Sequence, residues 1–131
     1  MKKNFIKLKT DADEIIKTDF IDEFIRLVET ETISVECLIM PSIKSYWQKS
    51  AMVICSLDDK YLDQVYYYLL QWIMDLNWPG ACEIFHFLTS KKALQLDIAF
   101  EKALKNARFL EDVDWLDNLS YLQEARHHNS F

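Results

Sequence analysis

Three side chains with complementary hydrogen-bonding groups lie close together near the middle of the chain: Asp75, Asn77 and Trp78. They belong to the segment Leu69–Ala81, which has the sequence LLQWIMDLNWPGA. A carboxylate, a carboxamide and an indole N–H in this proximity can bind a peptide backbone or a basic side chain. The structural alternative, which we favour, is that Asp75 or Asn77 caps the next helix while the Trp78 ring is buried between two helices. The candidate turn comprises Trp72, Asp75, Asn77, Trp78 and Pro79.

Other reactive side chains have less informative spacing. Cys82 and His86 are four residues apart, as two metal ligands on one helix face would be, but no further ligands lie at ligand spacing. Adjacent carboxylates such as Asp58 and Asp59 occur at expected helix starts, where capping explains them without acid–base chemistry. Gly80 is the only glycine, which excludes a glycine-rich phosphate loop. We therefore expect a non-enzymatic protein with no catalytic residue, no metal and no cofactor.

Acidic residues are concentrated in one segment of the chain. Residues 11–36 hold nine acids against Lys17 and Arg26, a net charge of −7, and the whole chain has a net charge of −6. Such a chain is a poor ligand for nucleic-acid phosphates, and its electrostatic field favours a basic protein partner. We predict that this partner contacts acidic and aromatic side chains of the first and central helices, namely Asp19, Asp22, Glu23, Asp58, Asp59, Asp63, Tyr67 and Tyr68.

The composition indicates a single helical domain. The chain has 131 residues, half of them hydrophobic, with one Gly and two Pro, and an all-β domain would need more turn residues than that. The longest apolar run, residues 65–70, is too short to span a membrane, and the basic start of the chain lacks the apolar core of a signal peptide. Three cysteines without paired spacing suit a reducing compartment. We expect a cytoplasmic protein, one domain over residues 1–131, and frayed ends at residues 1–10 and 127–131.

Apolar residues recur at three- and four-residue steps along most of the chain, which predicts amphipathic helices. Residues 33–40 are ambiguous between a strand and a short helix that ends before Pro41, and we favour the helix. The other predicted helices cover residues 11–30 (capped by Asp11 or Asp13), 43–57, 59–76, 79–89, 91–106 and 112–126. The fold class is all-α, either a short HEAT-like stack of antiparallel helix pairs or a globular helical bundle.

The periodicity also predicts which side chains are buried. In the helix expected at residues 91–106, the inward stripe includes Leu94 and Ile98. Pro79 is expected in the first turn of its helix, where a missing amide hydrogen costs nothing. With 14% aromatic residues, the core need not hold every ring, and the rings that we expect to be partly exposed are Trp47, Tyr67, Tyr68 and Trp115.

The segment Leu69–Ala81 resembles an uncharacterised bacterial domain-of-unknown-function family whose signature is LLxWLxDxNWPxA. A second landmark of that family, Asp-x-x-Trp, is similar to Asp112–Trp115 in this chain. The resemblance covers roughly residues 40–125. It implies an all-α, HEAT-like fold and implies no activity.

Three functional hypotheses follow from these observations. The first is a protein-binding module for a basic partner, in particular a bacterial toxin-neutralising (immunity) protein, because the chain is small, acidic and rich in aromatic residues. The second is a structural subunit that forms a homo-oligomer, such as a homodimer, through an aromatic face. The third is an enzyme with an unrecognised site.

Overall fold

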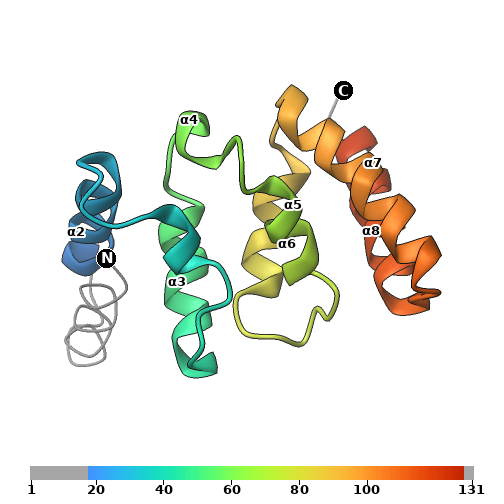
Figure 1. Cartoon of the computed structure of the whole chain (residues 1–131), viewed down its shortest axis with the longest axis horizontal. Helices are drawn as coiled ribbons and strands as arrows, with labels where there is room; N and C mark the ends of the chain where they lie inside the picture. Colours follow the sequence, from blue (N-terminus) through green and yellow to red (C-terminus); the bar gives the residue numbers. More distant parts are fainter. Residues whose placement is uncertain (1–17, 129–131) are drawn as a thin grey trace.

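The structure is a computed structural model that describes the backbone of residues 18–128 and the side chains of residues 21–128 (Figure 1). Every regular element in this range is a helix, so the fold is all-α, as predicted. The elements are α2 (Thr18–Glu29), the 3-10 helices η1 (Val35–Leu38) and η2 (Lys44–Tyr46), α3 (Trp47–Ile54), α4 (Asp59–Leu62), α5 (Tyr66–Trp72), α6 (Ala81–Thr89), α7 (Leu94–Phe109) and α8 (Val113–His128).

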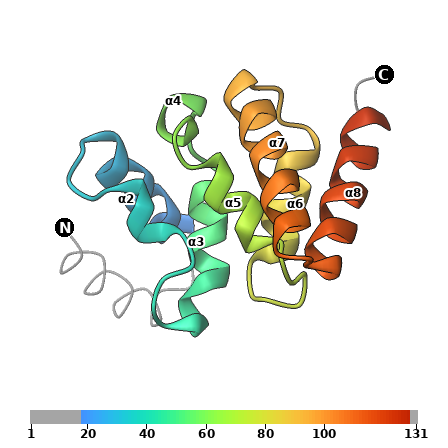
Figure 2. The same ribbon diagram turned by 45° about the vertical axis from the view of Figure 1, so that its right-hand side comes forward.

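The helices follow one another from one end of the molecule to the other (Figures 1 and 2). Helix α2 lies at one end and packs on α3, and α3 in turn contacts α6. Helices α7 and α8 pack against each other at the opposite end. Helix α5 contacts α7, and α6 contacts α8. The pair formed by α5 and α6 therefore lies beside the pair formed by α7 and α8, with the first helices of the two pairs in contact and the second helices in contact.

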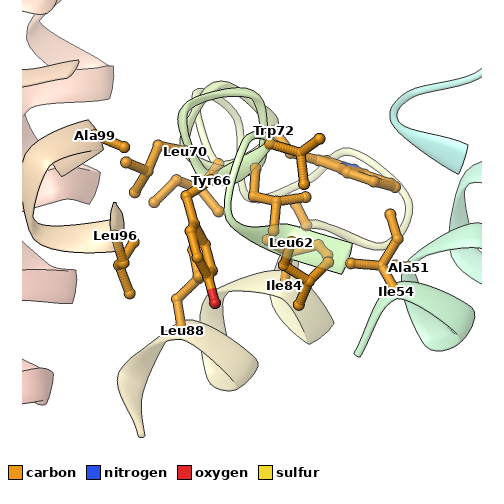
Figure 3. Close-up of a cluster of buried hydrophobic side chains, with 14 of the residues drawn as sticks. Ala51, Ile54, Leu62, Tyr66, Leu70, Trp72, Ile84, Leu88, Leu96 and Ala99 are labelled. Carbon is orange, nitrogen blue, oxygen red and sulfur yellow. The ribbon is translucent and has the colours of Figure 1, made fainter. Parts of the chain in front are cut away.

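One apolar core joins these helices, and its centre is formed by α5 and α6 (Figure 3). Tyr66 and Trp72 of α5 are almost completely buried. Three small residues of α7, spaced four apart, are also buried: Ala99, Ala103 and Ala107. Small side chains at this spacing let two helix backbones approach closely, which explains why α7 makes its most extensive helix contact with α5.

The prediction of one central helix over residues 59–76 is wrong, because the chain breaks between α4 and α5. Residues 63–65 form a turn between the two helices, in which Val65 has φ −119° and ψ 0° and its amide bonds to the Leu62 carbonyl over 2.9 Å. Leu62 and Val65 are both buried at this break. Two residues three apart share one face of a continuous helix as well, so the apolar periodicity of the segment could not reveal this break. Helix α5 also ends at Trp72, four residues earlier than predicted.

The start of α6 also differs from the prediction. Its N-cap is Gly80, with φ +81°, so Pro79 lies before the helix and not in its first turn. A Cβ on Gly80 would lie 2.8 Å from both the Cβ of Ala51 and the carbonyl oxygen of Trp47. Only glycine satisfies this positive φ and this close approach without strain. The predicted capping of α6 by Asp75 or Asn77 is therefore wrong.

Two predictions about burial fail in the C-terminal pair. Leu94 and Ile98, expected to face inward, are 71% and 56% exposed, because α7 buries the stripe that contains its alanines. Trp115, expected to be partly exposed, is completely buried. The expectation of partial exposure is confirmed for Trp47 and Tyr67, which are half-buried, and for Tyr68, which is exposed.

The helices predicted for residues 11–57 are confirmed only in part. The predicted first helix corresponds to α2, and its expected cap at Asp11 or Asp13 lies outside the described residues. Residues 33–40 contain the single turn η1, so the preferred helix is confirmed and the strand is wrong. The helix predicted at 43–57 is shorter than expected and consists of η2 followed by α3. At the other end, α8 continues through His128, into the tail that we expected to be frayed.

Candidate functional site

The turn between α5 and α6 is held by hydrogen bonds from both sides. The indole Nε1–H of Trp72 donates to the carbonyl oxygen of Pro79 over 2.9 Å. The amide of Gly80 donates to the side-chain oxygen of Gln48, on α3, over 2.9 Å. The turn is thereby fixed to the core on one side and to α3 on the other.

Within the turn, Asp75 and Asn77 bond to each other and not to α6. The backbone amide of Asn77 donates to Oδ1 of Asp75 over 2.8 Å, which closes a local side-chain turn. The Asn77 side chain is exposed. Pro79 has no amide hydrogen, and the amide of Gly80 already donates to Gln48. These two residues therefore shape the turn and leave the helix start to Gly80.

Tryptophan rings form a cluster beside the turn. The ring of Trp47 makes edge contacts with Trp72 at 5.9 Å and with Trp78 at 5.6 Å between centroids. The Nζ of Lys44 lies 5.3 Å from the Trp47 ring centre and 5.6 Å from that of Trp78. An ammonium group at such distances is attracted by the negative faces of the rings. The half-buried Trp78 ring thus already has a cation of the same chain beside it.

The most informative feature is an open pocket of about 630 Å³ between this turn and α8. It combines Asp75 with three further carboxylates that lie some forty residues later in the chain: Asp112, Asp114 and Asp117. Its lining contains no Lys, Arg or His. The full lining is Met74, Asp75, Leu76, Asn77, Trp78, Asp112, Asp114, Asp117, Asn118 and Tyr121.

Some of the pocket residues are occupied by structural hydrogen bonds. Asn118 donates from Nδ2 to the carbonyl oxygens of Ile73 and Met74, over 2.9 and 3.2 Å, which satisfies carbonyls left open by the end of α5. Oδ1 of Asp112 accepts the Trp115 amide over 3.0 Å, as a helix N-cap does. The predicted start of the last helix at residue 112 is thus confirmed, with Asp112 as the residue that caps it.

Other lining residues are exposed and available to a ligand. Asp114 and Asp117 are exposed on α8, and Tyr121 is 58% exposed. The turn residues were predicted from the sequence as a candidate site, but the later residues of the pocket were missed, namely Asp112, Asp114, Asp117, Asn118 and Tyr121. Four of these, all except Asp112, are spaced by three and four residues on one face of a helix, and this spacing is the signal that could have found them.

The acidic surface predicted from the sequence is divided in the structure. Asp59 bonds to the Nζ of Lys91 over 2.5 Å, and Glu23 pairs with Arg26 on its own helix. Asp22, Asp58 and Asp63 are exposed, and the Asp19 side chain lies outside the described residues. The pocket shared by α2 and α4 contains none of the six acids that were predicted to contact the partner; it is lined by Val28, Glu31, Ile33, Ser34, Val35 and Tyr61.

The two predicted tyrosines sit beside α7. The Tyr67 hydroxyl accepts a hydrogen bond from Nδ2 of Asn106 over 2.6 Å. The Nζ of Lys102 lies 4.4 Å from the centre of the Tyr67 ring. Tyr68 makes an edge contact with Tyr67 at 5.8 Å between centroids. Tyr67 is therefore engaged by the neighbouring helix, and Tyr68 is the more accessible of the two.

Two buried groups have strongly raised pKa values. Burial, followed by the charge of Glu83, raises the pKa of the Cys55 thiol from 9.0 to about 12, although Lys91 opposes the change. Burial, followed by the charges of Asp59 and Asp63, raises the pKa of the Tyr66 hydroxyl from 10.0 to about 12. Both groups are protonated at neutral pH, so the Cys55 thiol is not an activated nucleophile.

In the described part of the chain, no group of three His, Cys, Asp or Glu side chains is arranged to hold a metal ion. The thiol of Cys82 lies 3.5 Å from the carbonyl oxygen of Leu76.

No helix among the described residues is both long and apolar enough to cross a bilayer. Comparisons of the chain with protein-family models, with curated proteins and with solved structures found no match.

Proposed function

We propose that this chain is a non-enzymatic protein-binding module whose acidic pocket receives a basic side chain of a protein partner. The observation that carries the proposal is the convergence of Asp75, Asp112, Asp114 and Asp117 on one open pocket without a base in its lining. Clustered carboxylates raise the affinity for a cation, and one carboxylate can bind a guanidinium group in the bidentate manner, through two parallel N–H···O bonds.

The aromatic residues of the pocket support the same ligand. Trp78 and Tyr121 line the pocket together with the carboxylates. A guanidinium group stacks on aromatic faces as well as bonding to carboxylates, so arginine fits the lining better than lysine does.

The acidic segment at residues 11–36 has a separate role in this proposal. Its charge, together with Asp58, Asp59 and Asp63, steers a basic partner toward the molecule and raises the association rate. The pocket then supplies specific contacts after the encounter. Within this class we propose a cytoplasmic immunity protein, and a gene for a large secreted toxin next to the gene for this chain would support that role.

The architecture and the family resemblance are part of the proposal. We propose a HEAT-like stack, supported by the side-by-side contacts of α5 with α7 and of α6 with α8; a globular bundle is the alternative. A distant relationship to the uncharacterised bacterial family is supported by the closeness of its two landmarks, because Asp75 and Asp112 line the same pocket. The other functions under consideration are a structural homo-oligomer and an enzyme with an unrecognised site.

A titration with a small arginine derivative tests the pocket directly. We would add N-acetyl-arginine amide to isotopically labelled protein and follow backbone amide and indole signals by NMR. The signals of Trp78 and of residues 112–118 should shift, and N-acetyl-citrulline amide, which is nearly the same shape but uncharged, should leave them in place.

Variants locate the effect. Asp114→Asn combined with Asp117→Asn should abolish the shifts, while Asp22→Asn on α2 serves as a control and should not. Equal shifts with arginine and citrulline, or arginine-specific shifts confined to another surface, would overturn the proposal.

A further inference from the structure

Among the described residues, exposed large apolar side chains are most closely spaced in the turn between α7 and α8. Phe109 is 85% exposed, Leu110 58% and Val113 65%, and all three lie within five residues. The turn is at the tip of the helix pair, at the end of the molecule opposite α2 (Figures 1 and 2). Single exposed apolar residues are ordinary on protein surfaces, but a contiguous group of them marks a contact surface.

Opposite charges border this apolar tip. On the α7 side, Lys105 and Arg108 are exposed within the last two turns of the helix. On the α8 side, Asp114 and Asp117 are exposed within the first two turns, and the turn itself adds the exposed Glu111 and the half-buried Asp112 to this acidic side. Charges of these signs stabilise helix ends, which accounts for their presence on each helix. Stabilisation of helix ends does not account for the three apolar side chains between them.

A surface with an apolar centre, bases on one side and acids on the other is complementary to itself. When a two-fold axis lies in the contact plane between the two charged sides, the bases of one copy face the acids of the other, and the reverse contact forms at the same time. The apolar centres then meet at the axis. We propose that the α7–α8 turn, comprising Lys105, Arg108, Phe109, Leu110, Val113, Asp114 and Asp117, pairs with the same turn of a second copy of this chain.

The small extent of this surface implies a weak and reversible dimer. A few apolar side chains with charged flanks lie at the low end of the range for specific protein contacts. Self-association should therefore be sought at concentrations from about 10 µM to about 1 mM.

Pairing would also affect the pocket. Asp114 and Asp117 belong to both surfaces, so a dimer would cover part of the acidic pocket and compete with a basic ligand there. The inference does not rest on the proposed function, because self-association is measured on the purified chain without any other partner. Either proposal can fail while the other stands.

The experiment uses sedimentation equilibrium of the purified full chain and two charge-reversed variants. The first variant, Lys105→Glu with Arg108→Glu, carries acids on both sides of the tip. The second, Asp114→Lys with Asp117→Lys, carries bases on both sides. Each variant alone should self-associate at least tenfold more weakly than the wild type, because like charges then face each other.

An equimolar mixture of the two variants should restore dimers, because every contact in the mixed dimer joins opposite charges. A control with Asp22→Lys and Glu29→Lys on α2 has the same net charge as the second variant, raised from −6 to −2, and should dimerise like the wild type. Far-UV circular dichroism checks that all variants remain folded. Phe109→Ser should also weaken the dimer, since it removes the largest side chain of the apolar centre.

A wild-type chain that is monomeric at 1 mM would overturn the inference, and the exposed tip would then have to serve another partner. Dimers that persist in both charge-reversed variants, or a mixture that stays monomeric beside a dimeric wild type, would also overturn it.

Discussion

The indole Nε1–H of Trp115 donates a hydrogen bond to the carbonyl oxygen of Leu70 over 2.9 Å, which joins α8 to α5 across 45 residues of sequence. Trp115 is completely buried, so this bond lies in the core. This hydrogen bond fixes the position of α8 relative to α5. The acidic pocket depends on this placement, because Asp112, Asp114 and Asp117 lie on either side of Trp115 in the chain.

Replacing Trp115 with Phe should therefore destabilise the chain by about 2–3 kcal/mol. The variant keeps an aromatic ring but leaves the Leu70 carbonyl buried without its donor, and an unsatisfied buried group costs about 1–3 kcal/mol, to which the smaller ring adds a cavity. Urea unfolding followed by circular dichroism measures the change. Tyr121→Phe, at an exposed ring, is the control and should stay within about 0.5 kcal/mol of the wild type. An equally small effect for Trp115→Phe would contradict the role of this bond.

Gly80→Ala should destabilise the fold by about 2–4 kcal/mol. The positive φ is unfavourable for any L-residue with a side chain, and the new Cβ would collide with Ala51 and with the backbone of Trp47. Thermal unfolding measures the loss. A melting temperature equal to that of the wild type would mean that α6 does not begin at Gly80 in the manner described.

Asp75→Ala should cost about 1 kcal/mol, because it removes the acceptor of the Asn77 amide. Asn77→Ala should cost less than about 0.5 kcal/mol, since its exposed side chain caps no helix. Each variant replaces one side chain of the same turn, so their free energies of unfolding can be compared directly by urea unfolding. The opposite order of costs would restore Asn77 as the helix cap that the sequence suggested.

The stability of the fold should fall as the pH rises from about 9 to about 12. Cys55 and Tyr66 have pKa values in the folded state that are higher than their ordinary values, so the folded state holds these protons more tightly than the unfolded state. The stability that this provides is fully present below pH 9 and is lost as the pH approaches 12.

Urea unfolding at several alkaline pH values measures this loss. Cys55→Ala should reduce the pH dependence to the part that Tyr66 contributes, whereas Cys82→Ser, at an exposed thiol, should leave it unchanged. A slope that is the same with and without Cys55 would show that its thiol is not shielded from solvent.

The all-α class and most helix positions could be predicted from the sequence because apolar periodicity is a local signal. In α8, for example, Leu119 and Leu122 lie three residues apart on one face of the helix, and both are buried. In α7 the local signal is ambiguous, because apolar residues lie on two sides of the helix. The alanine stripe faces α5 and Leu94 and Ile98 are exposed, because small residues pack more closely against α5. This preference depends on a neighbouring helix that the sequence does not identify.

The candidate site was predictable only in part for the same reason. The turn at Asp75 drew attention because its residue types are unusual together. Its companions, Asp114 and Asp117, are ordinary acids at a helix start when taken alone. They become part of a pocket only because the Trp115–Leu70 bond brings α8 beside the turn. A contact between residues 45 positions apart cannot be predicted from the local sequence pattern.

The central claim is that a basic ligand is held by the pocket acids, with the α2 acids adding only long-range attraction. Fluorescence anisotropy of a labelled hexa-arginine peptide tests it when the wild type is compared with two charge-matched variants, Asp114→Asn/Asp117→Asn in the pocket and Asp22→Asn/Glu29→Asn on α2. At about 150 mM salt, where the Debye length is about 8 Å, long-range attraction is largely screened. The pocket variant should then bind at least fivefold more weakly than the wild type, and the α2 variant should bind nearly as well. Equal losses in the two variants, or a greater loss in the α2 variant, would contradict the claim.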